Sequence, residues 1–146
     1  MSPEDDVVGP TFRPFKDGLA KVLGELEAEV MECVWSEAEP VSARHVEEQV
    51  GRPRGIQYIT LVTVLNNLCR KGLLTREKEG RAFYYLPRMT RDQYVEKVSR
   101  EILSGVMGLG REAALRSFVD VLAENAPDEL EVLKKRLAER KGEEEA

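Results

Sequence analysis

The sequence predicts a mainly α protein, of the α+β kind, in which three helices and a two-stranded hairpin precede three further helices. Two observations predict this class. Apolar residues recur at spacings of three and four in several segments, as an α-helix with one buried face requires. A pattern of strand, tight turn and strand occurs in one stretch, "LLTREKEGRAFYYLP".

The chain begins with a segment for which we expect no regular structure. Residues 1–22 contain three prolines and two glycines without a sustained hydrophobic period, so we predict a flexible N-terminal arm. A first helix is expected from Gly24, where "GELEAEVMECVW" carries apolar side chains along one stripe. The stripe consists of Leu26, Val30, Met31, Val34 and Trp35.

Two more helices are predicted before the hairpin. Ser42 is placed to cap the second helix, and Gly51 is placed to end it. The third helix is expected to run from Gln57 to Arg70 and to stop at Gly72. Its apolar face consists of Leu61, Val64, Leu65 and Leu68, and its polar face consists of Gln57, Thr60, Thr63, Asn67 and Arg70.

Three helices and a basic hairpin within residues 23–88 are the layout of a winged helix-turn-helix domain that binds DNA. In such a domain the third helix fits the major groove, which is roughly 12 Å wide. The hairpin then lies against the sugar-phosphate backbone. We therefore expect the third helix to read bases and the hairpin to contact phosphates.

The distribution of charge agrees with this expectation. Residues 51–91 contain nine basic and two acidic residues, a local charge of +7 in a chain of net charge −5, which leaves −12 for the rest. Phosphate binding depends on the local field, so a pI of about 5.1 does not exclude nucleic acid. Charge alone would fit an ordinary solvated surface equally well.

The segment after the hairpin predicts a helical domain over residues 89–141, followed by an acidic tail at 142–146. Thr90 and Gln93 form a capping-box pattern, "GVMGLG" breaks the helix that follows near Met107, and Pro127 starts the last helix. Three short helices bury too little surface to be stable alone, so we predict that they form a homodimer. The alternative is an intramolecular bundle packed on the first domain. The predicted dimerisation residues are Val98, Ile102, Val106, Leu115, Phe118, Val119 and Leu122.

These residues resemble the BlaI/MecI family of penicillinase repressors, which are winged-helix transcriptional regulators. The resemblance is carried by three stretches: "LGELEAEVMECVWSEAEPVSARHVEE", "YITLVTVLNNLCRKGLLTREKEGRAFYYLP" and "REAALRSFVDVL". They begin at Leu23, Tyr58 and Arg111. The resemblance implies a homodimeric repressor that sits on double-stranded operator DNA containing an inverted repeat.

The resemblance also implies how repression is relieved. In related systems a membrane sensor protease detects a β-lactam, and the repressor is then cleaved within its C-terminal helices. The aligned cleavage pair in this chain is Ser117-Phe118, where the relatives have Asn-Phe. The implied role is control of antibiotic resistance, with the membrane sensor protease as a further partner.

Candidate DNA contacts follow from side-chain chemistry on the predicted winged helix. Hydroxyl, methyl and amide groups on the third helix can reach base edges, whereas cationic and hydroxyl groups around it suit phosphates. The base-contact candidates are Gln57, Tyr58, Thr60, Val62 and Thr63. The phosphate-contact candidates are Ser42, Arg44, Arg54, Arg70, Lys71, Arg81 and Tyr84.

No enzyme activity, cofactor or metal site is predicted. The sequence has no glycine-rich phosphate loop and no Cys/His metal spacing, and its single histidine, His45, has no evident orienting partner. Cys33 and Cys69 lie in apolar helical contexts, so we expect buried thiols. A copper-sensing branch of the family uses a cysteine-rich C-terminal motif, and no cysteine follows Cys69 here.

Two further expectations concern location and an alternative function. The sequence shows neither an apolar run of roughly 18 residues nor a secretion signal, so we expect a soluble cytoplasmic protein. A winged helix can also serve as a protein-interaction module, with the basic hairpin meeting an acidic partner, because a fold does not decide a function.

Overall fold

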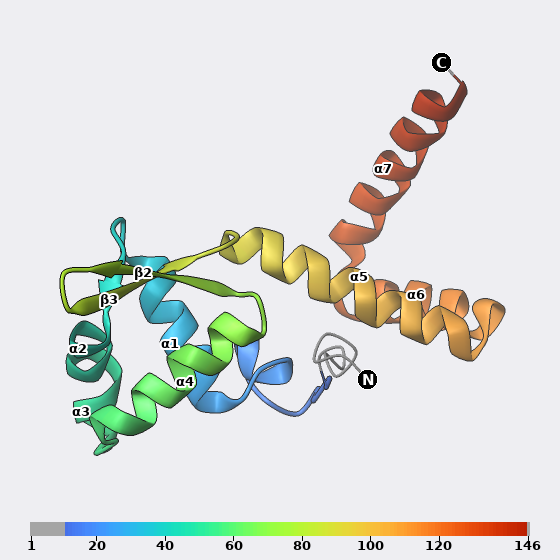
Figure 1. Cartoon of the computed structure of the whole chain (residues 1–146). Coiled ribbons are helices and arrows are strands. Elements are labelled where there is room, and N and C mark those ends of the chain that lie inside the picture. The colour runs from blue at the N-terminus through green and yellow to red at the C-terminus, as the bar shows by residue number, and fades with distance from the viewer. Residues whose placement is uncertain (1–10, 146) are drawn as a thin grey trace, which may run out of the picture. The chain divides into compact units, whose positions relative to one another are not determined.

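The computed structural model describes residues 11–145, which form two compact units (Figure 1). The first unit ends at Glu101 and the second begins at Ile102. Residues 1–10 of the expected arm and Ala146 of the expected tail lie outside the described residues. The elements of the first unit are η1 (Gly18–Lys21), α1 (Glu25–Ser36), β1 (Val41–Ser42), α2 (Ala43–Val46), η2 (Glu47–Gly51), α3 (Arg52–Arg54), α4 (Tyr58–Arg70), β2 (Leu74–Glu79) and β3 (Ala82–Pro87). The remaining helices are α5 (Arg91–Leu109), α6 (Arg111–Asn125) and α7 (Pro127–Glu145).

Helix α4 forms the centre of the first unit. Its inward stripe, Leu61, Leu65 and Leu68, is completely buried. The stripe contacts α1, α2 and β2, and the core includes Val30 and Met31 of α1. The apolar spacing of both helices therefore predicts their buried faces correctly, because each face meets another apolar face at helical spacing.

The wing belongs to a three-stranded antiparallel sheet with the strand order β1-β3-β2. The hairpin of β2 and β3 is confirmed, with Glu79 opposite Ala82 across the turn at Gly80 (φ 66°). The additional strand β1 pairs Val41 with Tyr85. The sequence did not predict this strand, because two residues are too short to display a period of two.

The second helix begins as predicted but ends elsewhere. The Ser42 hydroxyl accepts a hydrogen bond from the backbone N–H of His45 at 3.1 Å, which confirms it as the cap of α2. The predicted end at Gly51 is wrong, because the helical path continues through the π-helical turn η2 and α3 to Gly55 (φ 67°). Gly51 is needed for close packing, since a Cβ atom there would lie 2.5 Å from the Leu61 Cδ1 atom.

The described part of the N-terminal arm is folded, which corrects the expectation of a flexible segment. Residues 18–21 form the 3₁₀ turn η1, and the side chains of Leu19 and Leu23 are buried in the core. The Arg13 side chain donates to the backbone carbonyl of Ala20 at 3.4 Å, which ties the segment to its own turn. Two isolated leucines do not make a periodic pattern, so the sequence gives no signal for this packing.

The start of α5 belongs to the first unit. Its capping box is confirmed: the Thr90 N–H donates to the Gln93 side-chain oxygen at 2.9 Å, and the Gln93 N–H donates to the Thr90 hydroxyl at 3.1 Å. Tyr94 and Val98 are buried in the core of this unit. The first compact unit therefore extends to Glu101, beyond the predicted domain end at 88, and Val98, which was expected to contribute to dimerisation, is buried in its core.

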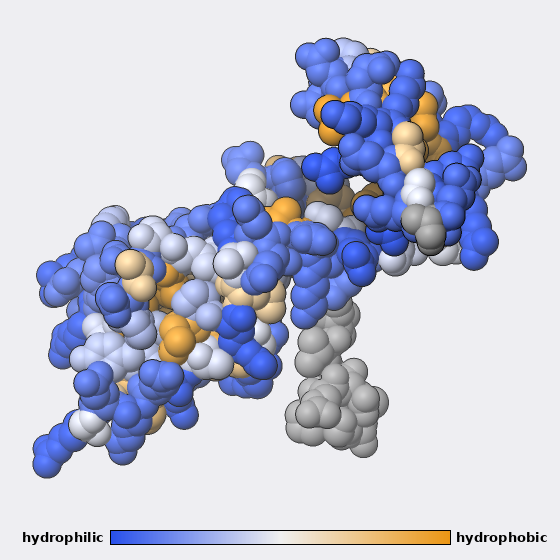
Figure 2. Space-filling view, turned by 90° about the horizontal axis from the view of Figure 1, so that it is seen from above, coloured by the Kyte–Doolittle hydropathy of each residue, from blue (hydrophilic) through white to orange (hydrophobic). Residues whose placement is uncertain are grey.

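The second unit comprises residues 102–145 and contains no buried residue. The predicted helix break is close to correct, since α5 continues through Gly105 and Gly108 and ends at Leu109. Helix α7 extends to Glu145, so the expected acidic tail is helical as far as it is described. Figure 2 shows apolar patches between the hydrophilic side chains of this unit. No helix within residues 11–145 has both the length and the apolar composition of a membrane span.

Candidate nucleic-acid interface

The outward face of α4 carries the predicted base-contact residues. The helix starts after Gln57, whose extended backbone ends the preceding loop. Because Leu61, Leu65 and Leu68 turn one face inward, the opposite face is left to solvent. Of the base-contact candidates, Gln57, Tyr58, Thr60 and Thr63 are exposed, and Val62 is half-buried.

The Thr63 hydroxyl is partly used within the helix. Its Oγ1 atom donates to the backbone carbonyl of Ile59 at 3.0 Å, one turn earlier. A threonine in this arrangement retains an acceptor lone pair and a methyl group for an external contact, but no free hydroxyl proton. Thr63 therefore suits an amino donor or a methyl group on a base edge.

Ile59 lies on the same face and was not among the predicted contacts. Its side chain is 65% exposed, although it stands in the first turn of α4. The sequence contained a usable signal. Ile59 precedes the buried Leu61 by two positions, which is about 200° around a helix of 3.6 residues per turn. The polar pattern of this face does not include Ile59, because its side chain is apolar.

The entrance to α4 is fixed by an aromatic and a cationic side chain. The Arg44 guanidinium of α2 stacks over the Tyr58 ring, 4.9 Å from its centroid. Arg44 is exposed and also lies 3.5 Å from the Glu47 carboxylate. The structure thus brings two predicted contact residues together, with Arg44 held next to the first turn of α4. Ser42 is half-buried, and its hydroxyl already caps α2.

The four other cationic phosphate candidates divide into two groups. The Lys71 ammonium contacts the Glu27 carboxylate at 2.8 Å, and the Arg54 guanidinium contacts Glu29 at 3.1 Å. Both cations are therefore neutralised locally by acidic residues of α1. Arg70 and Arg81 are exposed and form no ion pair with any residue of the described chain. These two are the cations most available to a phosphate.

The wing adds two cations that the sequence analysis did not select. Alternation along β2 places Arg76 and Lys78 on one face, opposite Tyr85 and Phe83 of β3. The Arg76 guanidinium lies 4.3 Å from the Phe83 centroid. Neither Arg76 nor Lys78 forms an ion pair among residues 11–145. Counting alternate strand positions would have identified both.

One asparagine of α4 forms hydrogen bonds to both strands of the wing. The Asn66 side-chain oxygen accepts from the Arg76 guanidinium and from the Tyr85 hydroxyl, each at 3.3 Å. The cationic face of the wing therefore lies on the α4 side of the sheet. The other face carries Glu77 and, opposite it, the half-buried Tyr84. Tyr84 is thus not brought together with the cations of the wing.

The two cysteines and the single histidine lie on three different helices, α1, α4 and α2. Cys33 and Cys69 are free and half-buried, and burial raises the pKa of each thiol. Contrary to expectation, His45 has a partner: its Nε2 atom lies 2.9 Å from the Glu37 carboxylate. Within residues 11–145 no three His, Cys, Asp or Glu side chains gather as a metal ion would require.

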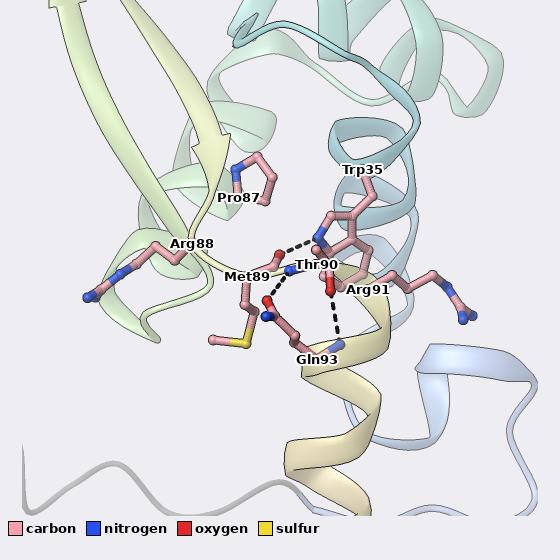
Figure 3. Close-up of a pocket in the computed structure, with 7 residues that line it drawn as sticks. All are labelled: Trp35, Pro87, Arg88, Met89, Thr90, Arg91 and Gln93. Atoms are coloured by element: carbon pink, nitrogen blue, oxygen red, sulfur yellow. Dashed lines mark hydrogen bonds between the residues drawn. The ribbon is translucent and has the colours of Figure 1, made fainter.

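A shallow pocket marks the junction between β3 and α5 (Figure 3). The Trp35 Nε1–H donates to the Met89 carbonyl at 2.9 Å, and the Trp35 ring lies 5.8 Å from that of Tyr94. Trp35 is half-buried and packs against the core, as the sequence predicted. It fastens the segment before α5 to the end of α1.

These features define a class of protein. Three helical segments followed by a wing, with unpaired cations beside the outward face of the third helical segment, constitute a winged helix-turn-helix protein. A family model described as "Penicillinase repressor" matches residues 23–139. The chain belongs to the penicillinase repressor family.

Several relatives share sequence over most of the chain. The "Transcriptional regulator BlaI" of Mycobacterium tuberculosis is 36% identical over 118 residues, which cover 80% of this chain and 83% of that protein. The "Methicillin resistance regulatory protein MecI" of Mammaliicoccus sciuri is 25% identical, over 77% of this chain and 89% of that protein. The solution structure of the DNA-binding domain of the repressor BlaI matches with a TM-score of 0.43 and 29% identity, and covers 47% of this chain and 83% of that domain.

Proposed function

We propose that this protein is a homodimeric, sequence-specific DNA-binding repressor of transcription that acts in the cytoplasm. One observation carries the proposal: four cations without an acidic partner in residues 11–145 lie on α4 and the adjoining wing. They are Arg70, Arg76, Lys78 and Arg81. Several other basic residues of the first unit, among them Lys16, Arg54, Lys71 and Arg91, are paired with carboxylates, whereas these four lie together on α4 and the wing, where they suit a polyanion.

In the proposed complex α4 enters the major groove of double-stranded DNA. Its outward side chains meet base edges, and the Arg44–Tyr58 pair sits where the helix enters the groove. Arg81 in the wing turn and Arg70 at the end of α4 contact phosphates. The phosphate contacts set the register of the protein, and the α4 side chains choose the sequence.

The second unit supplies the dimer in this proposal. Six of the seven predicted dimerisation residues lie in it, and none of the six is buried within the described chain. A second copy covers these apolar side chains and doubles the number of DNA contacts. A two-fold dimer then requires an inverted repeat in the operator.

Relief of repression by proteolysis is the remaining part of the proposal. Ser117 and Phe118 are both exposed near the middle of α6. Cleavage there would divide the helix that contributes Leu115, Phe118 and Val119 to the proposed dimer. Because proteases bind an extended backbone, a membrane sensor protease would have to unwind α6 before it cuts.

The salt dependence of DNA binding tests the function directly. Arg81→Ala is expected to weaken binding to every duplex and to reduce the log–log salt slope by about 0.9, because one phosphate contact is lost. Arg100→Ala is the matched control: it removes an exposed arginine of α5 that also has no ion pair in the described chain. Identical behaviour of the two variants would contradict the proposed docking.

A second measurement separates base reading from phosphate binding. Thr63→Ala should change the relative affinities for different sequences while leaving the salt slope unaltered. If the wild-type protein shows no duplex affinity even at low salt, the proposed function is wrong, and the alternative of an acidic protein partner is favoured.

A further inference from the structure

One exposed apolar side chain stands in the centre of the proposed DNA-binding face. At 65% exposure, Ile59 is the most exposed large hydrophobic residue in any helix or strand between residues 18 and 101. A single exposed isoleucine on an ordinary surface needs no explanation. This one differs because of its position and its neighbours.

The position is set by the buried stripe of α4. Ile59 is about 200° around the helix axis from Leu61, whose side chain is completely buried. It therefore points away from the core and into the space that a groove would occupy. It also stands in the first turn, the part of a recognition helix that reaches base edges.

Thr63 extends the apolar character of this position. It follows Ile59 by four residues and so lies on the same face, one turn further along. Its hydroxyl donates back to the Ile59 carbonyl at 3.0 Å. With the hydroxyl turned to the backbone, the methyl group takes one of the remaining staggered positions and adds to the apolar surface.

The surroundings identify the kind of ligand. Arg70 lies further along the same face, and Arg76 of the wing is joined to α4 through Asn66. The surface suits a ligand that is polyanionic and that also offers an apolar group to Ile59. The major groove of DNA does both, because thymine carries a 5-methyl group on its exposed edge.

We propose that Ile59 is a specificity-determining residue that packs on a thymine methyl group in each half of the operator, with Thr63 beside it. This inference rests on the proposed function of the same surface. The base that we expect this site to select is thymine. The selection would come from the fit of its methyl group and the removal of apolar surface from water, without a hydrogen bond.

Replacing thymine by 2′-deoxyuridine tests the contact, because the two differ only in the methyl group. Operator fragments are first selected from genomic DNA with the wild-type dimer. Each thymine of one half-site is then replaced singly, and affinity is measured for wild type, Ile59→Ser and Arg81→Ala. Equal thermal midpoints for the three proteins would show that the exposed substitutions leave the fold intact.

The expected result is a loss of about three- to fivefold for wild type at one thymine, as burial of one methyl group implies. Arg81→Ala should bind all duplexes more weakly yet show the same loss. Ile59→Ser should show none. If no thymine matters to wild type, or if Ile59→Ser shows the full loss, the contact with Ile59 is wrong while DNA binding stands. If wild type selects no DNA at all, the proposed function fails as well.

Discussion

The two units of this chain use similar apolar side chains in opposite ways. Every buried hydrophobic residue of the described chain lies between Leu19 and Val98. In the second unit Leu109 is 89% exposed and Leu137 is 61% exposed. The first unit closes its core because α1, α4 and the sheet meet from distant parts of the sequence. The helices of the second unit leave their apolar side chains without a buried core in the described chain, although α6 and α7 contact each other. This difference is the reason for our proposal that a second copy of the chain covers them.

The largest expected effect comes from comparing one leucine substitution in each unit. Equal effects on stability would contradict the difference between the units. Leu65→Ala in α4 should lower the free energy of unfolding of the first unit by about 2–5 kcal/mol, because it leaves a cavity in a completely buried site. Leu115→Ala, at a residue 54% exposed, should leave that transition unchanged. Denaturant unfolding measured for both variants checks the contrast, which would fail if the two losses were equal.

The stability at alkaline pH tests whether the start of α5 belongs to the core of the first unit. Burial raises the pKa of Tyr94 from 10.0 to about 12. The buried phenol therefore favours the folded state fully below pH 10, and this contribution is lost as the pH rises through 12. The loss is about 2–3 kcal/mol at 1.36 kcal/mol for each pKa unit. Unfolding free energies of wild type and Tyr94→Phe should diverge by about 2 kcal/mol between pH 8 and 11.5, which is most of this loss, and parallel curves would contradict the raised pKa.

A substitution at Phe118 tests whether a second copy of the chain covers the apolar side chains of the second unit. Its side chain is 41% exposed in α6. If a partner chain covers it, Phe118→Ala should raise the dimer dissociation constant by about 30-fold, the equivalent of roughly 2 kcal/mol. Sedimentation equilibrium gives the constant, and Glu124→Ala on the same helix is the control. A monomeric wild type at all concentrations would contradict the proposed dimer.

The smallest expected effect concerns the attachment of α5 to the first unit. Trp35→Phe keeps most of the apolar ring and removes the hydrogen bond to the Met89 carbonyl. We expect the unfolding free energy to fall by about 1 kcal/mol, the usual worth of one such bond. Because Trp35 is the only tryptophan, the variant must be followed by circular dichroism. An unchanged stability would mean that the bond does not hold α5 in place.

Sequence reasoning succeeded where the signal was local or strongly periodic. The stripe of α4, the cap at Ser42 and the capping box of Thr90 and Gln93 are all found where they were expected. It failed where a residue acts through a distant neighbour. The sequence predicts that Gly51 ends a helix, but its role is to let Leu61 approach. The strand β1 exists only because β3 offers it a partner.

The candidate site shows the same division. Exposure of Thr63 and Arg81 was predictable from helix periodicity and from the turn at Gly80. The pairing of Lys71 with Glu27 was not, because the two residues are 44 positions apart. Helix periodicity also places Ile59 on the outward face, but its apolar side chain does not fit a pattern of polar base contacts.

The sequence by itself determined the order of the helices, the wing and the local excess of positive charge, because each depends on residues close together in the chain. The tertiary structure decided which cations remain free, which leucines are buried and where the first unit ends. Those properties depend on side chains that meet only after folding. Composition alone counts the charges of residues 51–91, but only the fold shows which of them already have a partner.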